Sequence, residues 1–202
     1  MRGRLVAVGA ILALVSDESV AVVLTEFANF LNQAAMTHGL AVNGIQLSVA
    51  QMENAPRSPK NPDPDVYMGI GDPNVAGSTT YASAKLSELR WQLADNGPVI
   101  TSLGQQWAVL VDAEWEEHFR PSIAEAHNCN SNDLKYPLFG DLRKLRNDIV
   151  HHRGIATAQN VGRCELLIHW SEIGQTIFID APSIAEFLRR VPWNELRSGP
   201  SS

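Results

Sequence analysis

The sequence predicts a mainly α-helical protein that carries one small β-hairpin near its C-terminal end. Apolar residues recur every three or four positions through most of the chain between residues 17 and 152, which is typical of amphipathic helices. The pattern then changes to two strand-like runs over 165–180. Apolar residues make up 45% of the 202 residues, which is enough for a core, so we expect a single domain over 1–197 and a disordered tail over 198–202.

The first predicted helix covers residues 17–35, and Asp17 is its candidate cap. The apolar face of this helix consists of Val20, Leu24, Phe27 and Leu31. A stretch rich in proline and glycine follows at 54–78. Because proline has no N–H to donate, we expect an irregular insertion there.

Three further helices are predicted after the insertion. One begins at Thr79 and stops before Asn96-Gly97-Pro98. The next runs from about 99 to 126, and Pro121 is expected to kink or split it. Its apolar stripe comprises Leu103, Trp107, Val111, Trp115 and Phe119. The last covers 137–152, with Gly154 as its predicted left-handed cap.

The predicted hairpin joins a strand at 165–170 to a strand at 175–180. Ser171-Glu-Ile-Gly174 between them suits a hairpin loop. A short helix that opens at Pro182 is expected to follow.

Charge and cysteine content exclude several classes of protein. The net charge is −6, which disfavours a protein that coats nucleic acid without specificity. Cys129 and Cys164 form no Cys-x-x-Cys pair, so disulfide scaffolds and zinc modules are excluded and both are interpreted as packing residues. The apolar run at 5–15, which follows Arg2 and Arg4, is too short to span a bilayer. It is interpreted either as the start of a core helix or strand or as a secretory signal.

The predicted helix at 137–152 holds the most informative polar residues. Its apolar stripe, which fixes the buried face, is Leu138, Leu142, Leu145 and Ile149. Four basic residues and two histidines gather toward its end, against the single acid Asp148; they are Arg143, Lys144, Arg146, Arg153, His151 and His152. In an acidic chain this charge favours a polyanionic ligand, although a solvated helix face would carry similar residues.

The segment Arg146-Asn-Asp-Ile-Val-His151 resembles the Arg-x4-6-His motif of the HEPN superfamily (higher eukaryotes and prokaryotes nucleotide-binding domain). Its flanks are similar to the Leu-Arg-x-x-Arg-Asn-x-Ile-x-His stretch of many prokaryotic members, which a glycine follows. The matching flanking residues here are Leu142, Arg143, Asn147, Ile149 and Gly154. The resemblance is sharp over 138–156, loose over roughly 80–196 and absent over 1–78.

This resemblance implies a HEPN-like helical bundle with metal-independent endoribonuclease activity, as in toxins and phage-defence effectors. It implies that His151 transfers protons, that Arg146 holds the scissile phosphate and that Asn147 orients the histidine or the phosphate. Four neighbours are expected to bind substrate: Arg143, Lys144, His152 and Arg153. No metal and no cofactor is expected. The implied partners are RNA, a second copy joined through the 138–153 helix, and an antitoxin or nucleotidyltransferase-type protein, in the cytoplasm and without a membrane.

The chemistry is consistent with these residues. Cleavage of RNA without a metal needs a base for the 2′-hydroxyl and an acid for the leaving oxygen, and histidine can be either near neutral pH. It also needs a cation on the phosphate, which a guanidinium binds with two parallel hydrogen bonds. Helix geometry raises a difficulty, because Arg146 and His151 lie about 140° apart around a straight helix. We therefore expect the helix to loosen near His151 or a second copy to bring the groups together.

Other interpretations stay open. A histidine at a helix C-terminus is stabilised by the helix dipole, by about 0.3–1 kcal/mol, without any catalytic role. Simple pairing would account for the charges if Arg146 bound Asp141 or a glutamate elsewhere, if Arg143 bound Asn147 and if His152 bound Asp148. A separate alternative is a HEPN module that binds RNA, a nucleotide or a protein partner without cutting. If 5–15 is a signal, it would be a secreted helical interaction domain.

Overall fold

The computed structural model of this protein describes residues 3–55, 59–71 and 75–200, with side chains from residue 18 onward. It is mainly α-helical with one two-stranded antiparallel hairpin, as predicted. In chain order the elements are α1 (Gly3–Asn54), β1 (Asp65–Ile70), β2 (Thr79–Lys85), α2 (Leu86–Gln92), α3 (Pro98–Glu114), the π-helical turn η1 (Trp115–Phe119), α4 (Arg120–Ala126), the 3₁₀ turn η2 (Ser131–Asp133), α5 (Pro137–His151), the 3₁₀ turns η3 (Val161–Arg163) and η4 (Ile168–Trp170), α6 (Ala181–Arg190) and α7 (Trp193–Ser198).

The chain divides into two compact units. The first comprises the residues up to His38 and those from Gly104 onward, and the second comprises Gly39–Leu103. The expectation of one domain over 1–197 stays a prediction. The predicted tail at 198–202 begins at the residue that ends α7, and 201–202 lie outside the described residues.

Aromatic rings form the centre of the first unit around Phe27 of α1. The centroid of its ring lies 4.7 Å from that of Phe119 and 5.6 Å from that of Trp115. Rings of α5 and α7 complete the cluster, since Phe139 lies 5.9 Å and Trp193 5.7 Å from the same centroid. Burial of these rings stabilises the unit through the hydrophobic effect and fixes α5 against η1.

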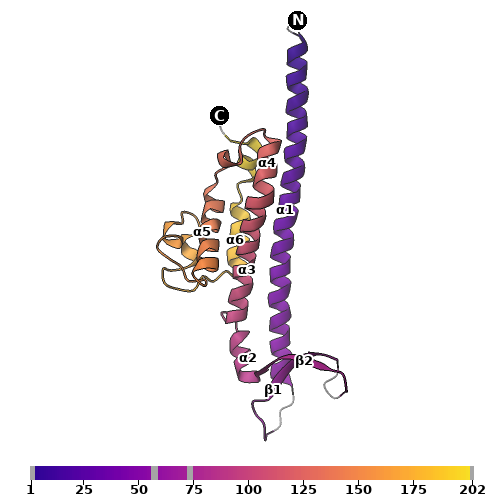
Figure 1. The fold of residues 1–202 in the computed structure, drawn as a ribbon, viewed down its shortest axis with the longest axis vertical. Coiled ribbons are helices and arrows are strands. Elements are labelled where there is room, and N and C mark those ends of the chain that lie inside the picture. The colour runs from indigo at the N-terminus through magenta and orange to yellow at the C-terminus, as the bar shows by residue number, and fades with distance from the viewer. Residues whose placement is uncertain (1–2, 56–58, 72–74, 201–202) are drawn as a thin grey trace. The chain divides into compact units, whose positions relative to one another are not determined.

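A second aromatic contact fixes α6. Phe187 of α6 is fully buried and meets Trp107 of α3 edge-on, with 5.4 Å between ring centroids. It also contacts Phe139 of α5 at 6.0 Å. Figure 1 shows the resulting arrangement, in which α5 and α6 lie alongside the successive helical segments α3, η1 and α4. Trp107, Val111, Trp115 and Phe119 are buried, as their spacing predicted.

The first helix is much longer than predicted. α1 runs from Gly3 to Asn54 rather than over 17–35, and it passes Asp17 without ending. No proline precedes Pro56, so nothing in this stretch removes a helical donor. The predicted buried face is confirmed at Val20, Leu24, Phe27 and Leu31.

The side chains of the apolar run at 5–15 lie outside the described residues. In the described part of the chain, no helix combines the length and the apolar character that a membrane span requires.

Pro121 splits the helix predicted at 99–126, as expected. α3 ends at Glu114, η1 follows, and α4 begins at Arg120. Pro121 cannot donate to the carbonyl four residues earlier, and the wider π-helical turn accommodates that loss. The consequence for the site is that Glu116 lies within the π-helical turn and Arg120 directly follows it, where the two side chains pair.

The hairpin lies in the second unit, not near the C-terminus. β1 pairs with β2 in an antiparallel register, from Asp65 opposite Lys85 to Ile70 opposite Thr79. The prediction of an irregular insertion at 54–78 is therefore wrong for β1, and the helix predicted from Thr79 begins only at Leu86. Thr79, Thr80 and Tyr81 are β-branched or aromatic and favour a strand.

The predicted strands at 165–170 and 175–180 do not pair with each other. The backbone N–H groups of Glu165, Leu166 and Leu167 donate to one carboxylate oxygen of Asp141, at 2.8, 2.6 and 3.0 Å. The chain therefore curls around that carboxylate and ends in η4 instead of extending. The later segment pairs with residues after α5, where Ile155 and Thr176 form an isolated antiparallel bridge.

The helix that carries the motif forms as predicted. α5 runs from Pro137 to His151, and its apolar stripe is buried at Leu138, Leu142 and Leu145. Gly154 follows with φ +73°, and its N–H donates to the carbonyls of Asp148 and Ile149. A Cβ at Gly154 would collide with the side-chain amide of Gln105, so glycine is required both by the conformation and by the space.

Candidate functional site

Three of the predicted site residues meet at the end of α5. Nη1 of Arg146 lies 3.3 Å from Oδ1 of Asn147 and 3.5 Å from Nε2 of His151. An arginine can only donate, so a hydrogen bond between these two groups requires Nε2 of His151 to be the acceptor. The site therefore places an imidazole nitrogen beside a guanidinium at the end of α5.

The expectation that a single straight helix would keep Arg146 from His151 is wrong. The side chains of a helix lean toward its N-terminus, so the imidazole of His151 points back along α5. The flexible arginine then has to cover only part of the rise of about 7.5 Å between the two residues. Neither a loosened helix nor a second copy is required for this contact, because α5 stays helical to His151.

An acid that sequence reasoning missed lies beneath Arg146. Asp112 of α3 is only 5% exposed, and its Oδ2 is 3.9 Å from Nε of Arg146. Its other oxygen, Oδ1, is buried without a hydrogen-bond partner among the described residues. Burial, together with the nearby carboxylate of Glu116, raises the pKa of Asp112 to about 6, although the guanidinium groups of Arg143 and Arg146 oppose that rise.

A second acid–arginine contact lies one helical turn away. Nη2 of Arg143 donates to Oε2 of Glu116 at 2.6 Å, and Nη1 of Arg120 donates to the same oxygen at 2.7 Å. Asp112 and Glu116 are four residues apart, and Arg143 precedes Arg146 by three, so the two contacts run in register along antiparallel helices. Arg143 thus binds Glu116 rather than Asn147, and its side chain is still 53% exposed.

The other predicted substrate-binding residues differ in their surroundings. Nζ of Lys144 donates to Oδ1 of Asp141 at 3.0 Å and to the carbonyl of Arg163 at 2.7 Å, which ties it to the structure. His152 and Arg153 are exposed beyond the end of α5, and Arg153 has a φ of +55°. The structure therefore brings Arg146, Asn147 and His151 into contact but does not place Lys144 with them.

Asp148 does not bind His152, contrary to the pairing considered for it. Its carboxylate accepts hydrogen bonds from the backbone and hydroxyl of Thr157, at 2.7 and 2.8 Å, and from the side-chain amide of Asn160 at 2.6 Å. Burial raises the pKa of Asp148, but these hydrogen bonds and that from the Val161 N–H outweigh burial and lower it overall. The carboxylate anchors the chain after α5 and so fixes where His151 lies.

Asp141 supports the other end of the same helix. Asp141 is fully buried, and burial raises its pKa. Hydrogen bonds from Leu166, Leu167, Lys144 and Glu165 together lower the pKa by more than burial raises it, so the pKa of Asp141 lies below its ordinary value. The earlier alternative of an Arg146–Asp141 pair is wrong, because Asp141 binds Lys144 and Arg146 faces Asp112. Two buried carboxylates thus hold α5 in place by accepting from loops that follow it.

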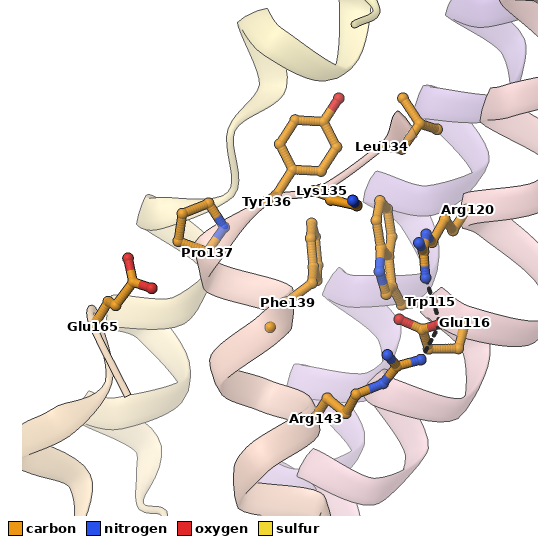
Figure 2. Close-up of a pocket in the computed structure, with 11 residues that line it drawn as sticks. Trp115, Glu116, Arg120, Leu134, Lys135, Tyr136, Pro137, Phe139, Arg143 and Glu165 are labelled. Atoms are coloured by element: carbon orange, nitrogen blue, oxygen red, sulfur yellow. Dashed lines mark hydrogen bonds and ion pairs between the residues drawn. The ribbon is translucent and has the colours of Figure 1, made fainter. Parts of the chain in front are cut away.

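A pocket of about 310 Å³ opens beside Arg143, between the start of α5 and the η1–α4 helix. Figure 2 shows Arg143 and Arg120 converging on Glu116 at one side of it and the Tyr136 ring at the other. The lining residues are Trp115, Glu116, Arg120, Leu134, Lys135, Tyr136, Pro137, Phe139, Gly140, Arg143 and Glu165. Three of these are cationic and two are anionic, which leaves a net positive charge beside the candidate site.

The His, Cys, Asp and Glu side chains are also candidate metal ligands, and the cysteines are candidate nucleophiles. In the described ranges, no group of three or more His, Cys, Asp or Glu side chains is placed to hold a metal ion. Burial raises the pKa of Cys164 to about 12, with Asp141 contributing, so this thiol is not a nucleophile at neutral pH.

Comparison with protein-family models, with curated proteins and with solved structures found no match.

Proposed function

We propose that this protein is a metal-independent endoribonuclease of the HEPN type. The observation that carries the proposal is the contact of Arg146 with both Asn147 and His151 at the exposed end of α5. These are the residues to which the sequence resemblance gives catalytic roles. Support also comes from the exposure of His151, which leaves the imidazole accessible to a strand of RNA.

The reaction uses His151 as the base. Its unprotonated Nε2 accepts the proton of a 2′-hydroxyl, and the resulting oxygen attacks the adjacent phosphorus. The bond from phosphorus to the 5′-oxygen breaks, which leaves a 2′,3′-cyclic phosphate and, once the leaving oxygen gains a proton, a 5′-hydroxyl. Arg146 lies within reach of the same phosphate, and its charge stabilises the additional negative charge of the transition state.

Asp112 and Asn147 position the arginine in this proposal. The 3.9 Å separation between Asp112 and Arg146 is longer than a hydrogen bond, so the guanidinium is oriented by charge yet keeps donors for a phosphate. Asn147 accepts from Nη1 of Arg146 and holds that nitrogen toward His151. The buried carboxylate thus acts through Arg146 and does not touch the RNA.

A homodimer through α5 is part of the proposal. The leaving oxygen needs a proton donor while His151 holds the base role, and a second copy of the chain would bring a second imidazole. Val150 supports this interface, because an apolar side chain beside His151 is 47% exposed. Toxin or phage-defence activity, and control by an antitoxin or nucleotidyltransferase-type partner in the cytoplasm, follow from the resemblance.

The test is cleavage of single-stranded RNA by the purified protein in the presence of EDTA. His151→Ala and Arg146→Ala should each reduce the rate by about 10²–10⁴-fold, as expected for loss of an acid–base group or of transition-state stabilisation. His118→Ala and Arg189→Ala are matched controls at exposed positions outside the site, and both should cleave at the wild-type rate. Circular dichroism should be the same for all four variants.

Two outcomes would overturn the proposal. Cleavage that survives in both His151→Ala and Arg146→Ala would show that these residues are not the site. An absence of cleavage, together with RNA binding that weakens in Arg146→Ala, would favour the non-catalytic HEPN module. The engagement of Arg143 by Glu116 and of Arg146 by Asp112 is the observation that favours this second candidate.

A further inference from the structure

The pocket beside Arg143 is continuous with the candidate site along one helix. Arg143 lines the pocket, and it precedes Arg146 by three residues and Asn147 by four on α5. Residues at these spacings are neighbours on a helix surface, with about 5–6 Å between their Cβ atoms. A chain that binds at Arg146 and continues along α5 therefore reaches Arg143 and then the pocket.

The pocket walls combine an aromatic surface with cations. Trp115 and Phe139 stack with 3.7 Å between their ring centroids, and both are almost fully buried, so they form a rigid floor. Tyr136 meets both rings edge-on and is only half-buried, which leaves part of its surface accessible. Figure 2 shows this ring above the floor and Pro137 beside it. Single-stranded RNA is recognised mainly through bases that stack on aromatic side chains, and of these three rings it is Tyr136 that has an accessible surface.

The charges at the pocket favour an anion. Lys135 and Arg143 are exposed at its rim, and Arg120 lies deeper, whereas the opposing acids are Glu116 and Glu165. Two guanidinium groups converge on a single oxygen of Glu116, at 2.6 and 2.7 Å, which is the geometry of an oxyanion site that a carboxylate now fills. Because Arg143 is half exposed, it can extend a donor to a phosphate without leaving the pocket.

We propose that this pocket is a subsite for a nucleotide next to the scissile phosphate, with the base against Tyr136 and Pro137 and the phosphate on Arg143. Its volume lies at the lower end of the range for small-molecule sites, about 300–1,000 Å³, and suits one nucleoside rather than a large cofactor. Burial raises the pKa of Tyr136, as do Glu195 and Cys129, so the phenol stays protonated and can donate to a base edge. The inference rests on the proposed function for the identity of the ligand.

Gly140 offers a direct way to fill the pocket. It lines the pocket, it is exposed, and a Cβ built on it meets no atom within 4 Å. Gly140→Leu should therefore fold, since alanine-like backbone geometry is favoured in a helix, while its side chain occupies space that the nucleotide needs. Gly140→Ala, which adds only a methyl group, is the matched control.

The probe is a single-stranded 2′-O-methyl RNA oligonucleotide, which cannot be cleaved because its attacking hydroxyl is blocked. Its affinity for the full chain is measured by fluorescence anisotropy at fixed salt. Gly140→Leu should weaken binding about tenfold or more, the equivalent of losing one stacked base, while Gly140→Ala should stay within about twofold. Arg143→Gln should weaken binding severalfold, and Arg189→Ala, the control for charge, should not.

Glu116→Gln is a variant that should change the RNA affinity in the opposite direction. Loss of the carboxylate charge releases Arg143 and Arg120 from their shared partner, so affinity should rise severalfold. Wild-type affinity in Gly140→Leu, Arg143→Gln and Glu116→Gln would overturn the subsite even if cleavage depends on His151. Conversely, Gly140-dependent binding by a protein that does not cleave would keep the subsite and overturn the nuclease, so the two failures are distinguishable.

Discussion

The buried carboxylate of Asp112 faces the guanidinium of Arg146 across the packing of α3 on α5, with 3.9 Å between Oδ2 and Nε. Its second oxygen has no hydrogen-bond partner within the described chain, and this leaves a charge that only the nearby arginines compensate. A group in this state changes its protonation easily near neutral pH, and the attraction that orients Arg146 changes with it.

The first prediction concerns pH. Because the pKa of Asp112 is raised to about 6, the ionised form that attracts Arg146 is present above pH 6 and is lost below it. Cleavage should therefore fall as the pH drops through 6, and Asp112→Asn should change the shape of the pH–rate profile in that range. Stability follows the opposite sign, since the folded protein binds a proton between about pH 4 and 6 that the unfolded chain has already released. The contribution of Asp112 to the free energy of unfolding should thus decrease as the pH rises over that interval. A pH–rate profile that is identical in Asp112→Asn would contradict the positioning role.

The second prediction concerns how the site is assembled. Arg146 and His151 of one chain are already in contact, at 3.5 Å, so each site should need both residues on the same polypeptide. A mixture of Arg146→Ala and His151→Ala protein, unfolded and refolded together so that mixed dimers form, should remain inactive. Recovery of a substantial share of the wild-type rate in the mixture would show instead that the two groups come from different chains. Light scattering of the mixture, which reports the dimer, completes the measurement.

The third prediction concerns Asp141. Its carboxylate is buried and accepts from three consecutive backbone N–H groups as well as from Lys144, so Asp141→Ala should lower the free energy of unfolding by about 3–5 kcal/mol. Asp95→Asn, at an exposed position in the second unit, should change it by about 0.5 kcal/mol or less. Urea denaturation followed by circular dichroism measures both.

Asp141 also carries a pH dependence of the opposite sign to that of Asp112. The pKa of Asp141 is lowered in the folded protein, so its stabilising contribution is fully present above the ordinary carboxyl pKa and is lost as the pH falls below about 4. The loss of unfolding free energy between pH 7 and acid pH should therefore be smaller in Asp141→Ala than in the wild type. An unfolding free energy equal to that of the wild type at both pH values would contradict this account of how the loop after α5 is held.

Local patterns predicted the part of the site that depends on one helix. The apolar phase of α5, its end at His151 and the left-handed Gly154 all follow from residues close together in the sequence. The hairpin was misplaced because Glu165–Leu167, which looks like the start of a strand, wraps a carboxylate that comes much earlier in the chain. No local pattern reveals a hydrogen bond between residues so far apart.

Asp112 escaped sequence reasoning for a related reason. It follows Val111 directly and lies within the window of a strongly apolar helix, so periodicity alone assigns it no role. The signal that could have found it is the pair of acids at Asp112 and Glu116, four residues apart on the flank of that helix, opposite a helix rich in arginine. Only the packing of α3 on α5 turns that pair into partners for Arg143 and Arg146.

The contact between Arg146 and His151 on one helix depends on the number of residues between them. A single residue inserted between Asn147 and Val150 would rotate the imidazole by about 100° and advance it by about 1.5 Å, away from the guanidinium. The residues between them are constrained as well, because Asn147 accepts from Arg146 and the buried Asp148 anchors the chain after α5. Within one chain, such an insertion should accordingly break the contact between Arg146 and His151.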